Sequence, residues 1–339
     1  RRQRGIVVLR HSRTGTLSLR FGVRYGLFRQ FVEKAVHFGF LGDRPWWGRR
    51  SRLFAGHHPS AWLASCRLCG TGFGGWLRRF ASRLPGRRQP GFQAARGVRI
   101  AGAFIGRNEQ RQQVAALVSN YLAGVLKNDM TVTVGQGRNV AAVANHVGVF
   151  PERHCRFICG IGGTKRDNQL IDADHISRNL ARKFNGFSET LYAPAYVETP
   201  ELRAAFMQNR LIKATLEQAS KADVAIIGLG DMNENSFMVQ LGWFTPQEIA
   251  TARQEQGVVG DLAGYSFFNI QGKPVDTVMN DRVIGLSLEQ LRAIPCVIAI
   301  ASESTKATAI LGALRTGVID VLATSASNAR SVINMQKAL

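Results

Sequence analysis

The chain has 339 residues, enough for two domains, and its hydrophobic content of 45% is ordinary for a globular protein. No apolar run reaches the roughly 18 to 20 residues that span a bilayer, and no signal of about 7 to 15 apolar residues follows the basic N-terminus, so we expect a cytoplasmic protein without membrane contact. The formal charge of +21 resembles that of nucleic-acid-binding proteins, but residues 1–100 carry 21 basic and two acidic residues, whereas the rest has a charge of only +2.

The first 97 residues form a basic segment whose composition differs from that of the rest. Twenty of the 21 basic residues before residue 100 are arginines, and four of the five tryptophans also lie there. Neither the period of a strand nor that of a helix is sustained, so we expect an irregular segment. Three interpretations stay open. The segment is a nucleic-acid-binding arm with aromatic stacking residues, a disordered tail, or the translation of a shifted reading frame of GC-rich DNA.

From residue 98 onward, helical and strand patterns alternate. Helices are predicted over 110–126, 140–147, 175–184, 201–222, 288–293, 306–316 and 326–335, and strands over 131–134, 157–161, 188–192, 223–229, 296–301 and 318–323. Alternation at this spacing predicts βαβ units on a mostly parallel sheet with flanking helices. Residues 98–339 are therefore predicted to form one α/β domain.

The first candidate site is the loop after the strand 131–134. It contains Gly135, Gln136, Gly137, Arg138 and Asn139. Ligands of parallel sheets bind beyond the carboxyl ends of the strands. Glycines let the backbone approach an anion, the next helix supplies free N–H groups, and Arg138 adds a charged donor. A plain turn between strand and helix contains the same glycines.

The second candidate loop follows the strand 157–161 and contains Gly162, Gly163, Thr164 and Lys165. Its glycines, hydroxyl and ammonium group suit a polar or anionic ligand. A flexible loop without a ligand is the alternative.

Two further loops each contribute one charged candidate. Asp261 follows a glycine in a predicted loop, where its carboxylate could accept hydrogen bonds from two sugar hydroxyls or cap a turn. Lys306 opens a predicted helix, where a cation opposes the helix dipole. Contact with a phosphate or a sugar would explain that conflict, and a solvated lysine is the alternative.

Other patterns do not support metal, cofactor or catalytic sites. Cys66 and Cys69 have the spacing of zinc ligands, but no second pair lies at a zinc-ribbon distance. The segment 228–230 lacks the full glycine pattern of a dinucleotide site. His146, His154 and His175 have no obvious nucleophile or carboxylate partner, so we expect no catalytic triad and no enzyme.

Seven runs in this order resemble the effector domain of SorC-type (DeoR-like) bacterial transcriptional regulators. They are 134–140, 159–164, 191–195, 222–230, 259–265, 283–286 and 303–307, and the resemblance extends over about two thirds of the chain. It implies a fold like that of sugar-phosphate isomerases (NagB-, RpiA- and CoA-transferase-like) that senses a sugar, polyol or sugar phosphate without converting it. It also implies a homo-oligomer that binds operator DNA.

The resemblance places the family's acid and lysine on Asp261 and Lys306. The family's first loop usually ends in Gly-Arg-Thr, whereas here Asn139 takes the last place and changes the reach of the hydrogen-bonding group. The family also begins with a helix-turn-helix of roughly 50 to 60 residues, and residues 1–97 show no such motif. A frameshift upstream of residue 98 would explain this difference.

Two other functions compete with sensing. A sugar-phosphate isomerase or deaminase would need a general base and a proton-relay histidine, and no candidate loop contains a histidine. Non-specific nucleic-acid binding through the basic segment would depend steeply on salt.

Overall fold

The computed structural model describes residues 106–338 apart from 147, 149 and 165–170, together with the backbone of three short strands near the N-terminus. The chain divides into two units, Arg1–Phe38 with Ala95–Leu339 and Gly39–Ala94, and all described residues belong to the first. Lys165, Cys66 and Cys69 lie outside the described residues.

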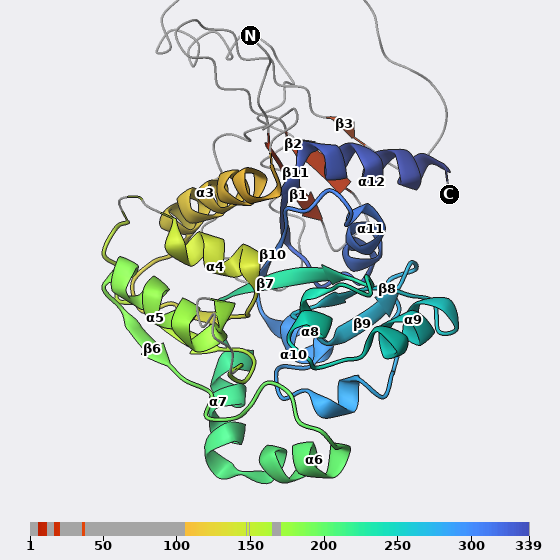
Figure 1. Cartoon of the computed structure of the whole chain (residues 1–339). Helices are drawn as coiled ribbons and strands as arrows, with labels where there is room; N and C mark the ends of the chain where they lie inside the picture. Colours follow the sequence, from red (N-terminus) through yellow and green to blue (C-terminus); the bar gives the residue numbers. More distant parts are fainter. Residues whose placement is uncertain are drawn as a thin grey trace, which may run out of the picture. The chain divides into compact units, whose positions relative to one another are not determined.

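The described residues are built around a sheet whose strands lie in the order β3-β2-β1-β11-β10-β7-β4-β5-β6 (Figure 1). The strands on this path are β1 Ile6–His11, β2 Leu17–Arg20, β3 Val36–His37, β4 Thr131–Val134, β5 Arg156–Cys159, β6 Phe187–Glu189, β7 Val224–Asp231, β10 Cys296–Ala301 and β11 Val321–Ser325. All pairs from β11 to β6 are parallel. The predicted α/β fold with a mostly parallel sheet is confirmed.

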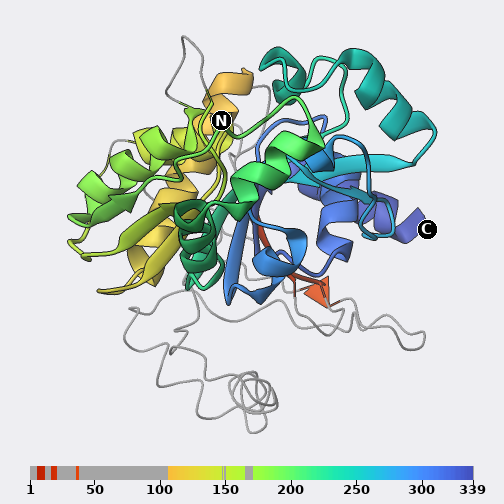
Figure 2. The same ribbon diagram turned by 90° about the horizontal axis from the view of Figure 1, so that it is seen from below.

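Helices cover both faces of the sheet (Figure 1, Figure 2). They are α3 Arg107–Val125, α4 Arg138–Asn145, α5 Ala173–Phe184, α6 Pro200–Gln208, α7 Arg210–Ser220, α8 Phe237–Gln240, α9 Pro246–Gln254, α10 Leu288–Ala293, α11 Ala307–Arg315 and α12 Ala326–Ala338, with a 3-10 turn, η2, at Asn280–Arg282.

The central strands are apolar throughout because both of their faces are buried. In β10, Ile298 and Ile300 pack with α3, α4 and α5, whereas Val297 and Ala299 pack with α7, α10, α11 and α12. Successive side chains of a strand point to opposite faces. This alternation produces one apolar core on each side of the sheet.

The segment 201–222, which was predicted to be mostly helical, consists of two helices. Asn209 separates α6 from α7, and its side-chain oxygen accepts hydrogen bonds from the N–H groups of Leu211 and Ile212. Asparagine favours this N-cap position because it satisfies donors that a helix start leaves free. The continuous helical pattern therefore concealed a helix end.

An antiparallel hairpin, β8 Val258–Leu262 with β9 Ser266–Asn269, was not predicted. β8 also pairs antiparallel with the last three residues of β7, from Leu229 to Asp231. That pairing explains why β7 runs two residues beyond its predicted end. The prediction that Asp261 lies in a loop is wrong, because Asp261 lies inside β8.

The strands β1, β2 and β3 lie in a segment where we expected no regular element. β1 pairs antiparallel with β11, and β2 and β3 extend the sheet beyond it. The outer edge of β11 offers backbone N–H and C=O groups that such pairing satisfies. Among the described residues, no helix is long and apolar enough to cross a membrane.

Tyr265 fixes the hairpin to the rest of the domain. It is buried, and its hydroxyl donates a hydrogen bond to the Leu286 carbonyl at 2.6 Å. We expect Tyr265→Phe to lower the free energy of unfolding by about 1 to 2 kcal/mol, because a buried carbonyl loses its partner. Urea denaturation measures this change. Tyr192→Phe is the matched control, since Tyr192 is 78% exposed, and an equal loss in both variants would contradict the assignment.

Candidate functional site

The carboxyl ends of β4, β7 and β10 meet where the direction of chain winding reverses. From β4 the chain proceeds to β5 and β6 on one side, and then crosses to β7, β10 and β11 on the other. Such a switch point opens a crevice beyond the strand ends, and ligands of parallel sheets bind there. We call the residues at this point, namely Gly135–Asn139, Asp261 and Lys306, the candidate site.

The loop after β4 presents the start of α4. Gly137 is the N-cap residue with a φ of 105°, which an L side chain rarely adopts, and no side chain caps this helix end. Arg138 is exposed, and its guanidinium lies 5.8 Å from the ring centre of Phe237 in α8. Free N–H groups beside an exposed cation form an arrangement that suits an anion.

Gln136 is buried, yet both atoms of its amide lack a hydrogen-bond partner within the described part of the chain. Leaving such a group without a partner costs about 1 to 3 kcal/mol. A ligand with hydroxyl groups could satisfy both the carbonyl and the NH₂ group. Among the sequence-predicted residues, Gln136 therefore has an amide whose hydrogen-bonding capacity is unused within the described part of the chain.

Asn139 has a different environment. Its Oδ1 accepts a hydrogen bond from the Ser302 hydroxyl at 2.6 Å, and its Nδ2 donates to Glu303 Oε2 at 3.0 Å. Both functions of the amide are thus engaged within the protein. Asn139 holds neighbouring groups of the site in place.

Asp261 is fully buried against the bare backbone of Gly230. The two residues are paired across β7 and β8, and a Cβ atom at Gly230 would lie 1.9 Å from Asp261 Oδ2. Oδ1 accepts a hydrogen bond from the Gly264 N–H at 2.7 Å, whereas Oδ2 lacks a partner among the described residues. The close approach of the two strands therefore requires glycine at position 230.

The environment of Asp261 favours its neutral form. Burial raises the pKa of its carboxyl to about 7, and nearby Asp231 acts in the same direction. Lys306 and the Gly264 N–H lower the pKa but do not offset the desolvation. Near neutral pH, Asp261 can therefore both donate and accept hydrogen bonds.

Glu303 connects three elements around the candidate site. Its carboxylate lies 3.2 Å from Arg111 Nη2 in α3, 3.0 Å from Asn139 Nδ2 in α4 and 3.0 Å from Lys306 Nζ. We call these four residues the Glu303 network. Lys306 also donates to the Leu229 carbonyl at 2.6 Å. It is the N-cap residue of α11, and the neighbouring carboxylate and carbonyl offset the unfavourable position of a cation there.

Glu303 is ionised throughout the physiological range. Burial acts to raise the pKa of its carboxyl, but Lys306 and the hydrogen bond from Asn139 outweigh it and hold the pKa at about 2. The pKa of Asp261 is thus raised and that of Glu303 lowered, because only Glu303 of these two acids lies in direct contact with cations.

The second predicted loop is linked to the first through residues 171 and 172. The Gly137 N–H donates to the Ile171 carbonyl, and the adjacent Asp172 accepts hydrogen bonds from the N–H and hydroxyl of Thr164. Gly163 exchanges backbone hydrogen bonds with Ala193 and Ala195. Thr164 therefore has a partner within the chain, while Lys165 lies outside the described residues.

For Gly162, the structure shows a packing requirement. A Cβ atom there would lie 2.3 Å from the Pro194 carbonyl oxygen. The residue is glycine because the backbone at Pro194 passes directly over it.

Neither Ser236 nor Arg111 was predicted from the sequence, and Glu303 was not predicted to be a contact residue. Ser236 immediately precedes α8, is buried, and has a hydroxyl without a partner in the described part of the chain. Its neighbour Phe237 is the residue that faces Arg138. The β7–β8 connection has little periodicity, so no sequence signal could have identified Ser236.

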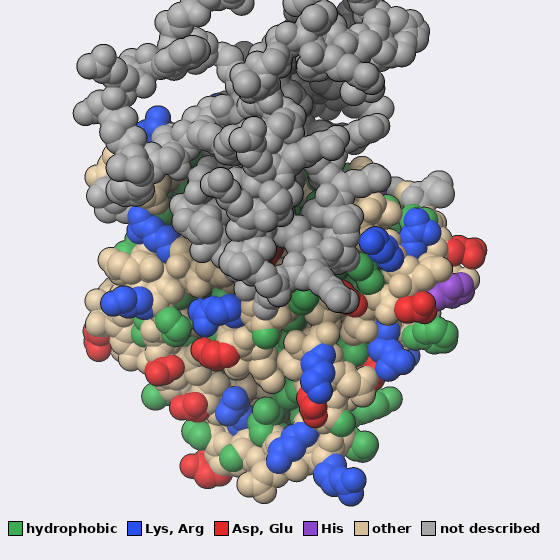
Figure 3. All heavy atoms as spheres, turned by 180° about the vertical axis from the view of Figure 1, so that it is seen from behind, with side chains coloured by type: hydrophobic (Ala, Val, Ile, Leu, Met, Phe, Trp, Pro, Cys, Tyr) green, Lys and Arg blue, Asp and Glu red, His purple; other side chains and the backbone are tan. Residues whose placement is uncertain are grey.

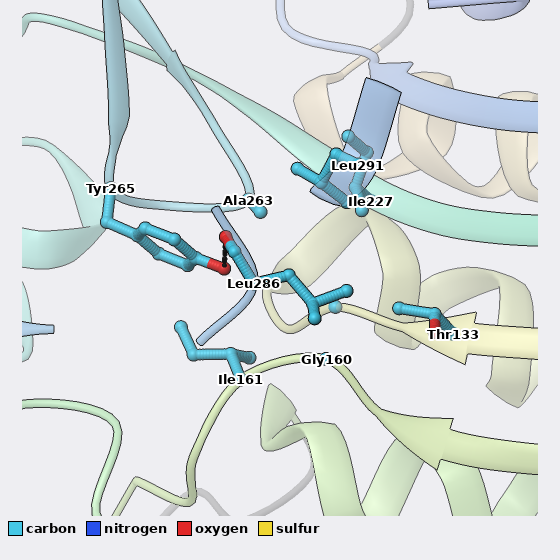
Figure 4. A pocket seen from close by; sticks show the side chains of 9 residues that line it. Thr133, Gly160, Ile161, Ile227, Ala263, Tyr265, Leu286 and Leu291 are labelled. Carbon is cyan, nitrogen blue, oxygen red and sulfur yellow. Dashed lines mark hydrogen bonds between the residues drawn. The ribbon is translucent and has the colours of Figure 1, made fainter. Parts of the chain in front are cut away.

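Figure 4 shows an apolar hollow between the ends of β4, β5 and β7 and the hairpin. Its lining comprises Thr133, Gly135, Gly160, Ile161, Ile227, Ala263, Tyr265, Leu286 and Leu291. It has no room for a water molecule, and the hydrogen bond between Tyr265 and Leu286 crosses one side. We interpret it as a packing gap under the hairpin. No cluster of metal-ligand side chains occurs in the described ranges.

The shifted pKa of Asp261 predicts a stability trend with pH. A carboxyl with a pKa near 7 in the folded state and near 3.8 when free holds its proton only in the folded protein between these values. Relative to Asp261→Asn, the wild-type free energy of unfolding should fall by roughly 3 to 4 kcal/mol between pH 4 and pH 7. Chemical denaturation at several pH values measures the difference. A constant difference would contradict the prediction, and exposed Asp281→Asn is the control.

The family described as "Putative sugar-binding domain" matches residues 95–334 of the chain. A solved structure described as "Putative Sugar-Binding Domain of Transcriptional Repressor", from Vibrio fischeri, is 56% identical. That likeness covers 70% of this chain and 94% of the other, with a TM-score of 0.66.

Two further relatives are less similar to this chain. The transcriptional regulator LsrR of Enterobacter sp. (strain 638) is 26% identical over 221 residues, which are 62% of this chain and 64% of the relative. The chain thus matches slightly less than two thirds of that relative's length. The full-length sorbitol operon regulator SorC of Klebsiella pneumoniae is 19% identical over 79% of this chain and 88% of the other, with a TM-score of 0.61, and it shows the fold alone.

The fold, the family match over most of the chain and the solved relative agree with one another. The chain belongs to the family described as "Putative sugar-binding domain", and its 56% identical solved relative is such a domain of a transcriptional repressor.

Proposed function

We propose that this chain senses a sugar, polyol or sugar phosphate at the candidate site and leaves it chemically unchanged. The observation that carries the proposal is that three of the buried polar groups, Gln136, Ser236 and Asp261 Oδ2, lack hydrogen-bond partners within the described residues. A polyhydroxyl compound supplies donors and acceptors for all of them. Arg138 and the uncapped start of α4 suit a phosphate on the same molecule.

The proposal extends to the whole protein as a transcriptional regulator that binds operator DNA as a homo-oligomer. The names of the relatives, a transcriptional repressor and a transcriptional regulator, support the regulatory part of this role. On the face shown in Figure 3, Lys and Arg side chains are interspersed with Asp and Glu over the part that is described. That described area is no basic surface of the kind that binds nucleic acid.

One observation favours a second candidate function, a sugar-phosphate isomerase or deaminase. Asp261 has a pKa raised to about 7 by burial, which is the property of a general base working near neutral pH. Its hydrogen bond with Gly264 and the position of Lys306 also fit a fixed binding role. Measuring turnover of each ligand that binds separates the two functions.

Binding is tested by thermal denaturation with ribose 5-phosphate, fructose 6-phosphate, glucose 6-phosphate and the matching unphosphorylated sugars. At least one compound should raise the melting temperature, because ligands stabilise the folded state that binds them. The Lys306→Ala variant should bind that compound about 10- to 100-fold more weakly, which is the loss expected for a hydrogen bond to a charged group. Exposed Lys213→Ala is the control. Steady conversion of the bound compound, followed by NMR, would favour the enzyme.

Gln136→Met distinguishes a ligand-binding role from a structural one. The change removes two buried polar atoms without partners at nearly constant volume, so the ligand-free protein should gain about 1 to 3 kcal/mol in stability. The same variant should lose affinity for the compound that stabilises the wild type. Reduced stability of the ligand-free variant would show that the amide has a structural partner and is not held for a ligand.

A further inference from the structure

The Glu303 network connects the candidate site with a helix outside it. Lys306 belongs to the site, whereas Arg111 lies in the second turn of α3, at the start of the domain. Arg111 and Glu303 are 192 residues apart in sequence. The segment that precedes α3 contains the first 106 residues of the chain. A link between Lys306 and Arg111 is therefore a link between the site and the beginning of this domain.

Within the described part of the chain, few other side-chain contacts are recorded for the start of α3. Its N-cap residue, Gly106, makes no side-chain cap hydrogen bond. The residues that bury α3 against the sheet, Val114, Val118 and Leu122, begin one turn after Arg111. Among the described residues, the side chains that contact Arg111 through hydrogen bonds are Asn108 in the preceding turn and Glu303. The Arg111–Glu303 pair, together with the contact of Arg111 to Asn108, thus links the first two turns of the helix to Glu303.

One carboxylate serves two cations in this network. Oε1 faces Arg111, while Oε2 faces both Lys306 and Asn139. The side chains of Arg111, Glu303 and Lys306 are only 12 to 15% exposed, so water screens their charges poorly. A change of charge at either cation therefore alters how strongly the carboxylate holds the other.

We propose that Glu303 is a positioning residue that couples Lys306 in the candidate site to Arg111 at the start of α3. When the charge of Lys306 is removed or neutralised by an anion, Glu303 interacts more strongly with Arg111 and holds the first turn of α3 more firmly. By thermodynamic reciprocity, loss of Arg111 strengthens the contact between Glu303 and Lys306. The regulatory meaning of this coupling rests on the proposed function, but the coupling itself needs no ligand.

The competing possibility is a set of static ion pairs in which each contact contributes independently. Arg111 would then hold α3 to the same degree whether or not Lys306 is charged. Destabilisation by itself does not distinguish the two, because removing a partner from a buried ion pair lowers stability in both cases. The test must therefore measure an effect at one cation of a change made at the other.

The experiment uses the full chain without ligand and measures two quantities. Hydrogen exchange of a peptide covering residues 107–113 reports on the first turn of α3, and the rate of reductive methylation reports on the Lys306 amine. In Lys306→Met, we expect the α3 peptide to exchange about two- to tenfold more slowly, the range for coupled neighbours. In Arg111→Met, we expect methylation of Lys306 to slow by a similar factor.

Glu303→Gln tests whether the carboxylate carries the effect. The glutamine keeps an oxygen for Asn139 but removes the charge, so both cross-effects should disappear in this background. Arg111→Lys keeps the positive charge and should restore most of the wild-type methylation rate. Lys221→Met is the control, because Lys221 pairs with Glu217 on the surface of α7 and should leave the α3 peptide unchanged.

The outcomes separate the two possibilities. Cross-effects that vanish with Glu303→Gln support the coupling. Unchanged exchange of the α3 peptide in Lys306→Met, together with unchanged methylation in Arg111→Met, would overturn it. If Glu303→Gln does not fold, the two methionine variants alone still decide the question. Failure to find any sugar ligand would count against the proposed function and would leave this result intact.

Discussion

The close approach of β7 and β8 is the constraint on which the rest of the candidate site depends. With glycine at position 230, the Asp261 carboxyl lies where a Cβ atom would otherwise be, and the hairpin can pair with the end of β7. Through that pairing, β7 continues beyond the point where its parallel pairing with β10 ends. The pairing also fixes the Leu229 carbonyl, which accepts a hydrogen bond from Lys306. The absence of a side chain at Gly230 therefore determines the positions of Asp261 and Lys306, the two charged residues that the sequence analysis identified.

The same constraint leaves polar groups buried at a cost. Asp261 Oδ2, Gln136 and Ser236 are enclosed without partners among the described residues, and each such group lowers the stability of the ligand-free domain. Asp261 avoids part of this cost by keeping its proton, as its raised pKa shows. Glu303 instead stays ionised between two cations. The site thus combines neutral hydrogen-bonding groups with a fixed charge network, and both features suit recognition of a polar ligand.

Much of the fold could be predicted because the central strands are buried on both faces. Continuous apolar runs such as 296–301 have no other satisfactory environment in a soluble domain, and the glycine-rich loops mark the strand ends. Prediction failed where tertiary pairing overrides local pattern. The strand β8 reads Val-Val-Gly-Asp-Leu, and its glycine and aspartate resemble those of a loop. Only the pairing with Gly230 explains why an aspartate occupies a buried strand.

The candidate residues also differ in how well their roles could be predicted from the sequence alone. Lys306 was identified from a local conflict, a cation at a helix start, and the structure gives the physical reason in Glu303 and the Leu229 carbonyl. Asn139 was chosen for its position in a glycine-rich loop, yet its amide is engaged by Ser302 and Glu303. Arg111 could not be predicted at all, because its partner is 192 residues away and no local pattern marks such a contact.

Mapping a bound ligand onto the backbone tests the central claim most directly. NMR chemical shifts of the amide groups are followed during titration with whichever sugar phosphate stabilises the protein. The largest changes should occur at residues 135–139, 261–264 and 303–306, which surround the switch point of the sheet. Changes concentrated elsewhere, for example around the exposed Phe187 and Tyr192 near strand β6, would contradict the location of the site.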